Sequence, residues 1–113
     1  MADIEMTAAY ASIVEDEGQL FVGFAEGEDE DEGYALFRQP VTGGPVWFEV
    51  TDEVFGGFDA VERADVVEGR LTVVIRPEMQ IRFGGVARVL IHLGDAESAA
   101  EAVAAVHGML TQA

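Results

Sequence analysis

The sequence predicts an α+β domain made mainly of antiparallel β-sheet, with seven or eight short strands and one C-terminal helix packed on the sheet. Short apolar segments separated by glycine, proline or acidic turns fill residues 4 to 93, as expected for strands. An alanine-rich segment with helical spacing follows at about 96–111. The chain has 113 residues and half of them are apolar, so we expect a single domain, 1–113, with one core.

The N-terminal segments predict a hairpin followed by an acidic loop. Residues 4–14 are largely apolar, 15–18 form an acidic turn ending in glycine, and 19–25 are apolar again, which is typical of two strands. Both faces of the segment 20–24 are apolar, so we expect this strand to be central and covered on both faces. Mutual repulsion of the carboxylates should keep the loop 26–33 in solvent.

The next two predicted strands are 33–38 and 46–50, because the intervening glycines and prolines interrupt a strand. Alternation within the second of them places Trp47 and Glu49 on its more polar face. This pattern leaves two alternatives open for Trp47, a position on the surface or one beneath a helix.

The middle of the chain predicts a loop and then a second hairpin. Residues 52–58 carry a glycine pair between two phenylalanines and interrupt the strand pattern, so we interpret them as a loop. Residues 59–67 form a strand of irregular period, and 70–75 alternate regularly. The turn at Glu68 and Gly69 therefore predicts a hairpin.

The last strands and the helix complete the prediction. Alternation across 79–83 and 86–93 predicts either one bent strand or two. Asp95 or Ser98 would cap the helix that follows, and Ser98 with Glu101 matches a capping box. We expect the alanine and valine stripe of this helix to pack against the sheet.

The sequence offers little for catalysis, so we expect no enzyme activity, no catalytic residue, no metal and no cofactor. There is no cysteine, and neither serine lies in a Gly-x-Ser-x-Gly elbow. His92 and His107 lack metal-ligand spacing. The glycine pairs do not form a phosphate-binding loop, and the acidic segment lacks the central glycine of an EF-hand.

The charge is unevenly distributed along the chain. Of the formal charge of −16, the part before Arg38 carries −11 and the rest carries −5, because all six basic residues are arginines from Arg38 onward. Such a block favours cationic partners and excludes nucleic acid and anionic membranes, which need clustered basic residues. No apolar stretch could span a bilayer and the N-terminus is acidic, so we expect a cytoplasmic protein.

The acidic run Glu28-Asp29-Glu30-Asp31-Glu32 has three interpretations. It is a solvated turn between strands, a weak site for divalent cations, or a partner site in which guanidinium or ammonium groups replace the water around the carboxylates. The sequence alone leaves these three open.

A succession of segments also points to a family. In order, these are Leu-Phe-Val-Gly-Phe-Ala at 20–25 with the acidic stretch, Gly-Tyr-Ala-Leu-Phe-Arg-Gln at 33–39, Val-Trp-Phe-Glu-Val-Thr-Asp-Glu at 46–53, the glycine pair 56–57, and Arg-Leu-Thr-Val-Val-Ile at 70–75. This succession resembles the immunity protein 10 family, the small intracellular antidotes of bacterial polymorphic toxin systems. The resemblance implies a non-catalytic protein that neutralises a cognate toxin by covering its active surface.

The leading hypothesis is therefore an immunity protein that binds a cognate basic toxin through an acidic and aromatic surface. Carboxylates would steer the encounter and aromatic rings would anchor it, although each ring could instead belong to the protein's own core. The candidate partner-binding residues are Glu28, Asp29, Glu30, Asp31 and Glu32 for steering, with Trp47, Asp52, Glu53, Phe55 and Phe58 for contact. The alternative is an acidic, salt-adapted structural or small-ligand module that self-associates, for example as a homodimer.

Overall fold

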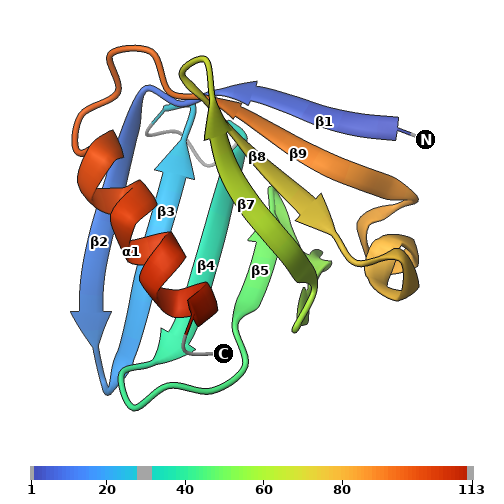
Figure 1. The fold of residues 1–113 in the computed structure, drawn as a ribbon, viewed down its shortest axis with the longest axis horizontal. Coiled ribbons are helices and arrows are strands. Elements are labelled where there is room, and N and C mark those ends of the chain that lie inside the picture. Colours follow the sequence, from blue (N-terminus) through green and yellow to red (C-terminus); the bar gives the residue numbers. More distant parts are fainter. Residues whose placement is uncertain (1, 28–31, 112–113) are drawn as a thin grey trace.

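The computed structural model describes residues 2–27 and 32–111, and these residues form two β-sheets with one α-helix and one 3₁₀-helix (Figure 1). The elements in chain order are β1 (Ala2–Thr7), β2 (Tyr10–Asp16), β3 (Gln19–Ala25), β4 (Tyr34–Pro40), β5 (Trp47–Val50), β6 (Asp52–Phe58), β7 (Val61–Val67), β8 (Arg70–Ile75), η1 (Pro77–Phe83), β9 (Val86–His92) and α1 (Ala99–Thr111). The predicted α+β class, mainly antiparallel sheet with a C-terminal helix, is confirmed.

The five-stranded sheet has the order β2-β3-β4-β5-β6, so every strand pairs antiparallel with its neighbour in the chain. The predicted hairpin between β2 and β3 is present, and its two turn residues, Glu17 and Gly18, have φ of 50° and 78°. Two consecutive residues with positive φ suit the right-handed twist of the flanking strands. The sheet is thus assembled entirely from local connections.

The four-stranded sheet has the order β1-β9-β8-β7, with β1 parallel to β9 (Figure 1). The predicted hairpin at Glu68 and Gly69 joins β7 to β8, with φ of 51° and 75°. We expected residues 4–14 to form one strand, and this is wrong. The Ala8 N–H donates to the His92 carbonyl across 2.9 Å in one sheet, whereas the Ala9 N–H donates to Ala25 across 2.8 Å in the other.

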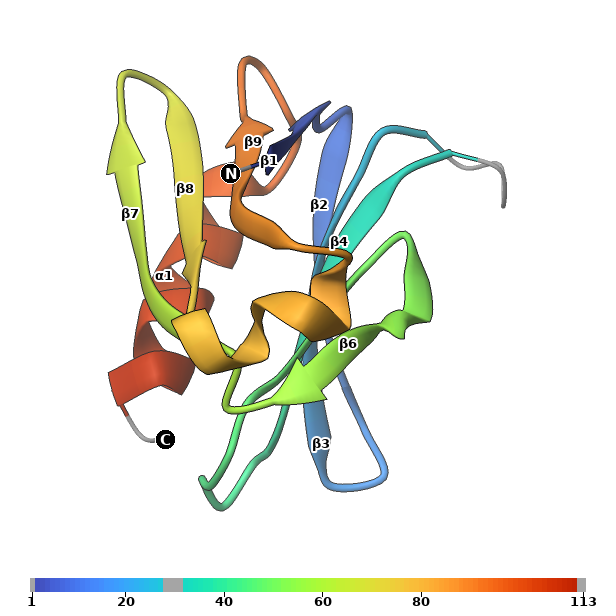
Figure 2. The same cartoon turned by 90° about the vertical axis from the view of Figure 1, so that its right-hand side faces the viewer.

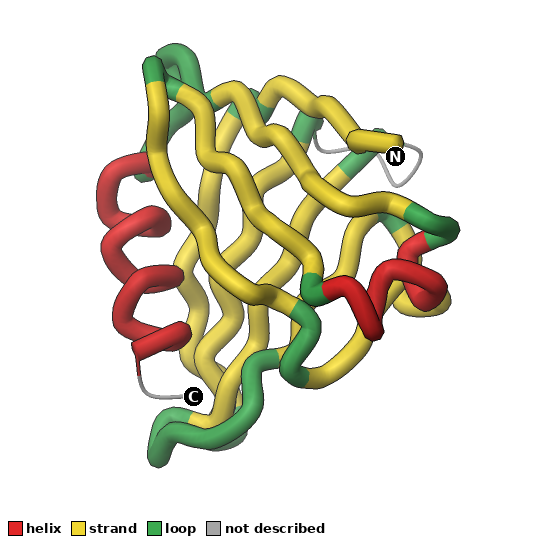
Figure 3. The backbone as a smooth tube through the Cα atoms, turned by 45° about the vertical axis from the view of Figure 1, so that its right-hand side comes forward, coloured by secondary structure: helices red, strands yellow, loops and turns green. Residues whose placement is uncertain are grey.

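The core lies between the inner faces of the two sheets (Figures 2 and 3). Phe37 lies at its centre, with ring centroids 6.4 Å from Phe24 and 4.6 Å from Phe48, and Phe48 is 5.8 Å from Phe83. These four rings are almost completely buried. Aromatic pairs at such distances add to the stabilisation that comes from burial alone.

Helix α1 closes the side of the sandwich where β2 and β7 lie apart, and it crosses the inner face of β2 and β3 (Figure 1). Its buried residues, Ala102, Val106 and Met109, form the expected apolar stripe. The helix begins at Ala99, directly after Ser98, whose φ of 63° is left-handed. An N-cap residue normally has an extended backbone, so this start differs from the predicted capping box.

Two segments differ from the sequence prediction. Residues 52–58 are the strand β6 rather than a loop, and 77–83 form the 3₁₀-helix η1 rather than a strand. The two segments are in contact, because η1 packs on β6. A Cβ at Gly57 would lie 2.6 Å from the Met79 Cε, so the glycine provides room for η1 rather than flexibility.

Candidate partner-binding face

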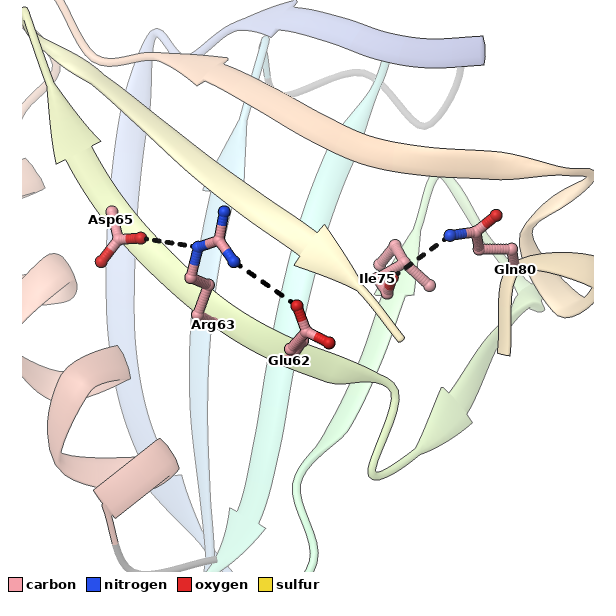
Figure 4. Close-up of polar contacts among 5 residues, drawn as sticks. All are labelled: Glu62, Arg63, Asp65, Ile75 and Gln80. Carbon is pink, nitrogen blue, oxygen red and sulfur yellow. Dashed lines mark hydrogen bonds and ion pairs between the residues drawn. The ribbon is translucent and has the colours of Figure 1, made fainter. Parts of the chain in front are cut away.

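The outer faces of the two sheets have opposite chemical character. On the four-stranded sheet, Arg88 pairs with Asp3 at 2.7 Å, and the hydrogen bonds from Arg88 lower the pKa of Asp3 below its usual range. Arg63 pairs with both Glu62 and Asp65, at 3.4 and 3.2 Å (Figure 4). This face carries ion pairs, together with Thr72 and the apolar Val74 and Leu90.

The outer face of the five-stranded sheet is largely apolar, and no other element among the described residues covers it (Figure 2). Strand register places one residue from each strand in a single line across this face. We call this line the aromatic row, and it consists of Val14, Phe21, Arg38, Trp47 and Phe58. Val14 and Phe58 are 50% and 55% exposed, and the other three are partly buried.

The open face also corrects an expectation about β3. The apolar residues on both sides of 20–24 predicted a strand covered on both faces, yet only the side with Val22 and Phe24 is buried in the core. Phe21 stands on the other side, in the aromatic row. Among the described residues, the apolar side chains on that second side contact only neighbours in the same sheet.

A buried carboxylate fixes the orientation of Trp47. Glu49 stands on the same outer face, but only 8% of it is exposed. The Trp47 indole N–H donates to Glu49 Oε1 across 2.7 Å, and the Tyr34 hydroxyl donates to Glu49 Oε2. A Cβ at Gly56 would lie 2.7 Å from Trp47 Cζ2, so the indole lies directly against the β6 backbone. Trp47 is therefore an ordered surface aromatic.

Arg38 carries the positive charge of the aromatic row. Its Cζ lies 5.2 Å from the Trp47 ring centroid and 6.0 Å from that of Phe58, within the range of cation–π contacts. The two rings meet edge to face, with centroids 5.1 Å apart. Within residues 2–27 and 32–111, Arg38 has no ion pair and its guanidinium makes no hydrogen bond.

Acidic residues lie at both ends of this face. The last residue of β2, Asp16, and the turn residue Glu17 lie at one end. At the other end, the two oxygens of Glu26 accept the Gly33 N–H at 3.2 Å and the Thr7 N–H at 3.4 Å, which holds together the two ends of the acidic loop. The aromatic row therefore lies on a sheet whose ends are negatively charged.

The structure places the predicted contact residues on two sides of β6. It brings together Trp47 and Phe58, as neighbours in register. Phe55 instead lies beside η1, where a Cβ at Gly84 would be 3.8 Å from its ring. Asp52 begins β6 and its carboxylate accepts the Val54 N–H at 3.1 Å.

The remaining predicted residues are acidic. Glu53 belongs to β6. Glu32 ends the acidic loop, with its carboxylate against Gly27. The other four members of the acidic run, Glu28, Asp29, Glu30 and Asp31, lie outside the described residues.

Sequence reasoning did not select Phe21, Tyr34, Arg38 or Glu49. Alternation within each strand could place these residues on one face, but only the pairing register shows that Phe21, Arg38 and Trp47 stand next to one another. The tight turn at Glu17 and Gly18 fixes the register of β2 with β3 and so places Phe21 opposite Val14, but the longer connections that lead to β4 and β5 fix no register for Arg38 and Trp47.

The described residues show no arrangement typical of a metal centre. Nowhere in 2–27 and 32–111 do three or more histidine, cysteine or acidic side chains gather around a common point. His92 Nε2 lies 3.0 Å from Glu5, and His107 Nε2 lies 3.0 Å from the Ala64 carbonyl on β7. In the same part of the chain, no helix has the length and apolar character needed to cross a membrane.

Comparison with protein-family models, with curated proteins and with solved structures gave no match for this chain.

Proposed function

We propose that this chain is a non-catalytic, immunity-type protein that binds and neutralises a cognate basic toxin domain, as its resemblance to the immunity protein 10 family implies. The observation that supports the proposal is the outer face of the five-stranded sheet. The outer face of the four-stranded sheet carries ion pairs, whereas that of the five-stranded sheet carries the aromatic row. An exposed apolar patch with a polar rim is typical of a protein interaction site.

The aromatic row has the composition of an interface centre. Tryptophan, arginine and tyrosine are the residues most enriched among those that dominate binding energy. Here Trp47 is held by Glu49 and by the close approach of Gly56, so little side-chain entropy would be lost on binding. Phe58 is more exposed than Trp47 and is suited to enter a pocket of the partner.

The charge distribution supports a basic partner. With a formal charge of −16, the chain attracts cationic surfaces over distances of about a Debye length, roughly 8 Å at physiological salt. Carboxylates at the ends of the sheet would raise the association rate and orient the encounter. We propose that the acidic run Glu28 to Glu32 takes part in this steering.

Self-association through the same face is the competing possibility, and charge opposes it. Two copies that met face to face would bring together two chains of −16 each and two Arg38 side chains. Like charges across an interface are costly. We therefore expect a monomer by light scattering at about 0.1 M salt, where the Debye length is roughly 10 Å.

The test uses the basic C-terminal domain of a polymorphic toxin encoded beside this chain. Co-expression should restore growth of cells that produce the toxin domain, and calorimetry should give a one-to-one complex. Trp47→Ala and Phe58→Ala should each weaken binding by about 10-fold or more. The matched controls on the other sheet face, Arg63→Ala and Thr72→Ala, should change affinity less than about 2-fold, as expected outside an interface.

Two results would contradict the proposal. The first is that no neighbouring toxin domain binds the chain. The second is that Arg63→Ala and Thr72→Ala weaken binding while Trp47→Ala and Phe58→Ala do not, which would place the interface on the other sheet.

A further inference from the structure

We infer that Arg38 receives one carboxylate of the partner, so that the surface recognised by this chain has a single Asp or Glu at the centre of a basic rim. The inference rests on the proposed function and specifies the chemistry of the partner. It starts from the contrast between Arg38 and two arginines of the four-stranded sheet; a third arginine there, Arg70, also has no carboxylate partner among the described residues but lies outside the aromatic row. Arg63 and Arg88 have carboxylate partners within 3.4 Å, whereas Arg38 has none among the described residues.

The surroundings of Arg38 leave its donors available. The guanidinium carbon lies over the rings of Trp47 and Phe58, at 5.2 and 6.0 Å from their centroids, and a cation–π contact of this kind is not a hydrogen bond to an acceptor oxygen. Its N–H groups donate in the guanidinium plane, as a fork that matches a carboxylate. The rings therefore hold the guanidinium in place, while its N–H groups have no acceptor among the described residues.

Burial of the face requires a negative group at this point. A partner that covered the aromatic row with apolar atoms alone would remove Arg38 from water and leave its charge uncompensated, which is strongly unfavourable. A backbone carbonyl would accept a hydrogen bond but would not neutralise the charge. A carboxylate does both, through two parallel hydrogen bonds.

A phosphate group fits this position less well than a carboxylate. The ends of the sheet carry Asp16 and Glu17 on one side and Glu26 and Glu32 on the other. These residues repel the repeated charges of a nucleic-acid backbone, which needs several cations to displace its counterions. A single carboxylate surrounded by arginine or lysine side chains complements both the centre and the ends of the face.

This arrangement would give specificity in addition to affinity. A basic surface without the central acid would still be attracted by the chain, yet docking would leave Arg38 buried and unpaired. Unfavourable groups of this kind distinguish one partner from another of similar charge. We therefore expect the central carboxylate, rather than overall charge, to separate the cognate toxin domain from other basic proteins.

The experiment is a double-mutant cycle with the same neighbouring toxin domain. Arg38→Gln should weaken binding roughly 30-fold or more, mainly through faster dissociation, and Arg38→Lys should restore part of the loss. One Asp→Asn or Glu→Gln variant of the toxin domain should cause a comparable loss. The two losses should not add when both changes are present, because each removes the same contact.

Arg63→Gln is the matched control, since it removes a paired arginine from the other sheet, and unchanged thermal unfolding would show that each variant is folded. If Arg38→Gln binds as tightly as the wild type while Trp47→Ala and Phe58→Ala weaken binding, the inference is overturned and the proposed function stands. The same holds if no carboxylate of the toxin domain couples to Arg38. If the wild type does not bind the toxin domain, the proposed function fails and this inference fails with it.

Discussion

Trp47 and Glu49 lie two residues apart on β5, and the indole N–H of Trp47 donates a 2.7 Å hydrogen bond to the Glu49 carboxylate. Side chains at this spacing stand on the same face of a strand. The carboxylate also accepts the Tyr34 hydroxyl, and it is buried although it lies on the outer side of the sheet. Glu49 therefore supports the aromatic row from within rather than contributing to the acidic surface.

Removal of this carboxylate should reduce both stability and order. Glu49→Ala leaves the buried Trp47 N–H without its acceptor, which should lower the free energy of unfolding by about 1–3 kcal/mol. Glu49→Gln should lose less, because its amide oxygen can still accept from Trp47. Urea unfolding followed by near-ultraviolet circular dichroism measures both effects. Equal losses in the two variants would show that the hydrogen bond does not hold the indole.

Gly56 should not tolerate a methyl group. In Gly56→Ala the new Cβ would lie 2.7 Å from Trp47 Cζ2 and 3.0 Å from the Glu49 Cβ, so the indole must move. We expect a loss of about 1–3 kcal/mol, the usual cost of overpacking. Gly23→Ala is the matched control in the same sheet, where the nearest atom to the Cβ is 3.4 Å away. Thermal unfolding and tryptophan fluorescence would contradict the expectation if both variants behaved alike.

The Asp3 and Arg88 pair should make stability depend on pH on the acid side. The hydrogen bonds from Arg88 hold the pKa of Asp3 below its usual value of 3.8 in the folded protein. A group whose folded pKa is depressed contributes stability above its unfolded pKa, and that contribution is lost as the pH falls through the folded pKa. Wild type and Arg88→Gln should therefore converge in stability at low pH.

An NMR titration of the Asp3 carboxyl carbon checks this directly. The pKa should lie below 3.8 in the wild type and should rise in Arg88→Gln. An Asp3 pKa that is the same in both proteins would mean that the ion pair does not persist in solution.

Gly108 offers a stabilising substitution. It lies within α1, and a Cβ there would meet no atom within 4 Å. Gly108→Ala should therefore raise the free energy of unfolding by up to about 1 kcal/mol, through helix propensity. Gly69→Ala is the contrasting case, because its Cβ also meets nothing but its φ of 75° is left-handed. That variant should be destabilised, and urea unfolding of the two should give opposite signs.

Local patterns predicted the elements that depend on neighbouring residues. Two consecutive turn residues predicted the hairpins at Glu17 and at Glu68, and helical spacing of alanine and valine predicted the C-terminal helix. The predictions were wrong for segments whose secondary structure depends on contacts with other elements. The strand β6 has its glycine pair because Trp47 and Met79 approach its backbone, and neither residue is close in sequence. Alternation in Met79–Phe83 likewise could not show that η1 is packed on β6.

For the same reason, only part of the candidate site could be predicted from the sequence. Trp47 and Phe58 were selected as exposed aromatics, and the structure places them in contact. Arg38 was not selected, because alternation within β4 does not reveal which residues of β3 and β5 stand beside it. The uncovered face could not be predicted from Phe21 and its neighbours. An apolar strand has the same sequence pattern whether it is covered by its own chain or by a partner protein.

The parallel pairing of β1 with β9 sets an order of events during synthesis. Within their sheet, strands β2 to β6 pair with chain neighbours, and one bridge from Tyr10 to Glu97 is added later, so this sheet can assemble while the ribosome is still extending the chain. The first strand has no such neighbour, since Ala2 pairs with Val86. Until β9 emerges, no strand joins β1 to the β7–β8 hairpin, so the layer opposite the phenylalanine side of the completed sheet is incomplete and apolar surface stays exposed. A molecule that stalls before residue 86 would therefore be a target for chaperones rather than a smaller version of this fold.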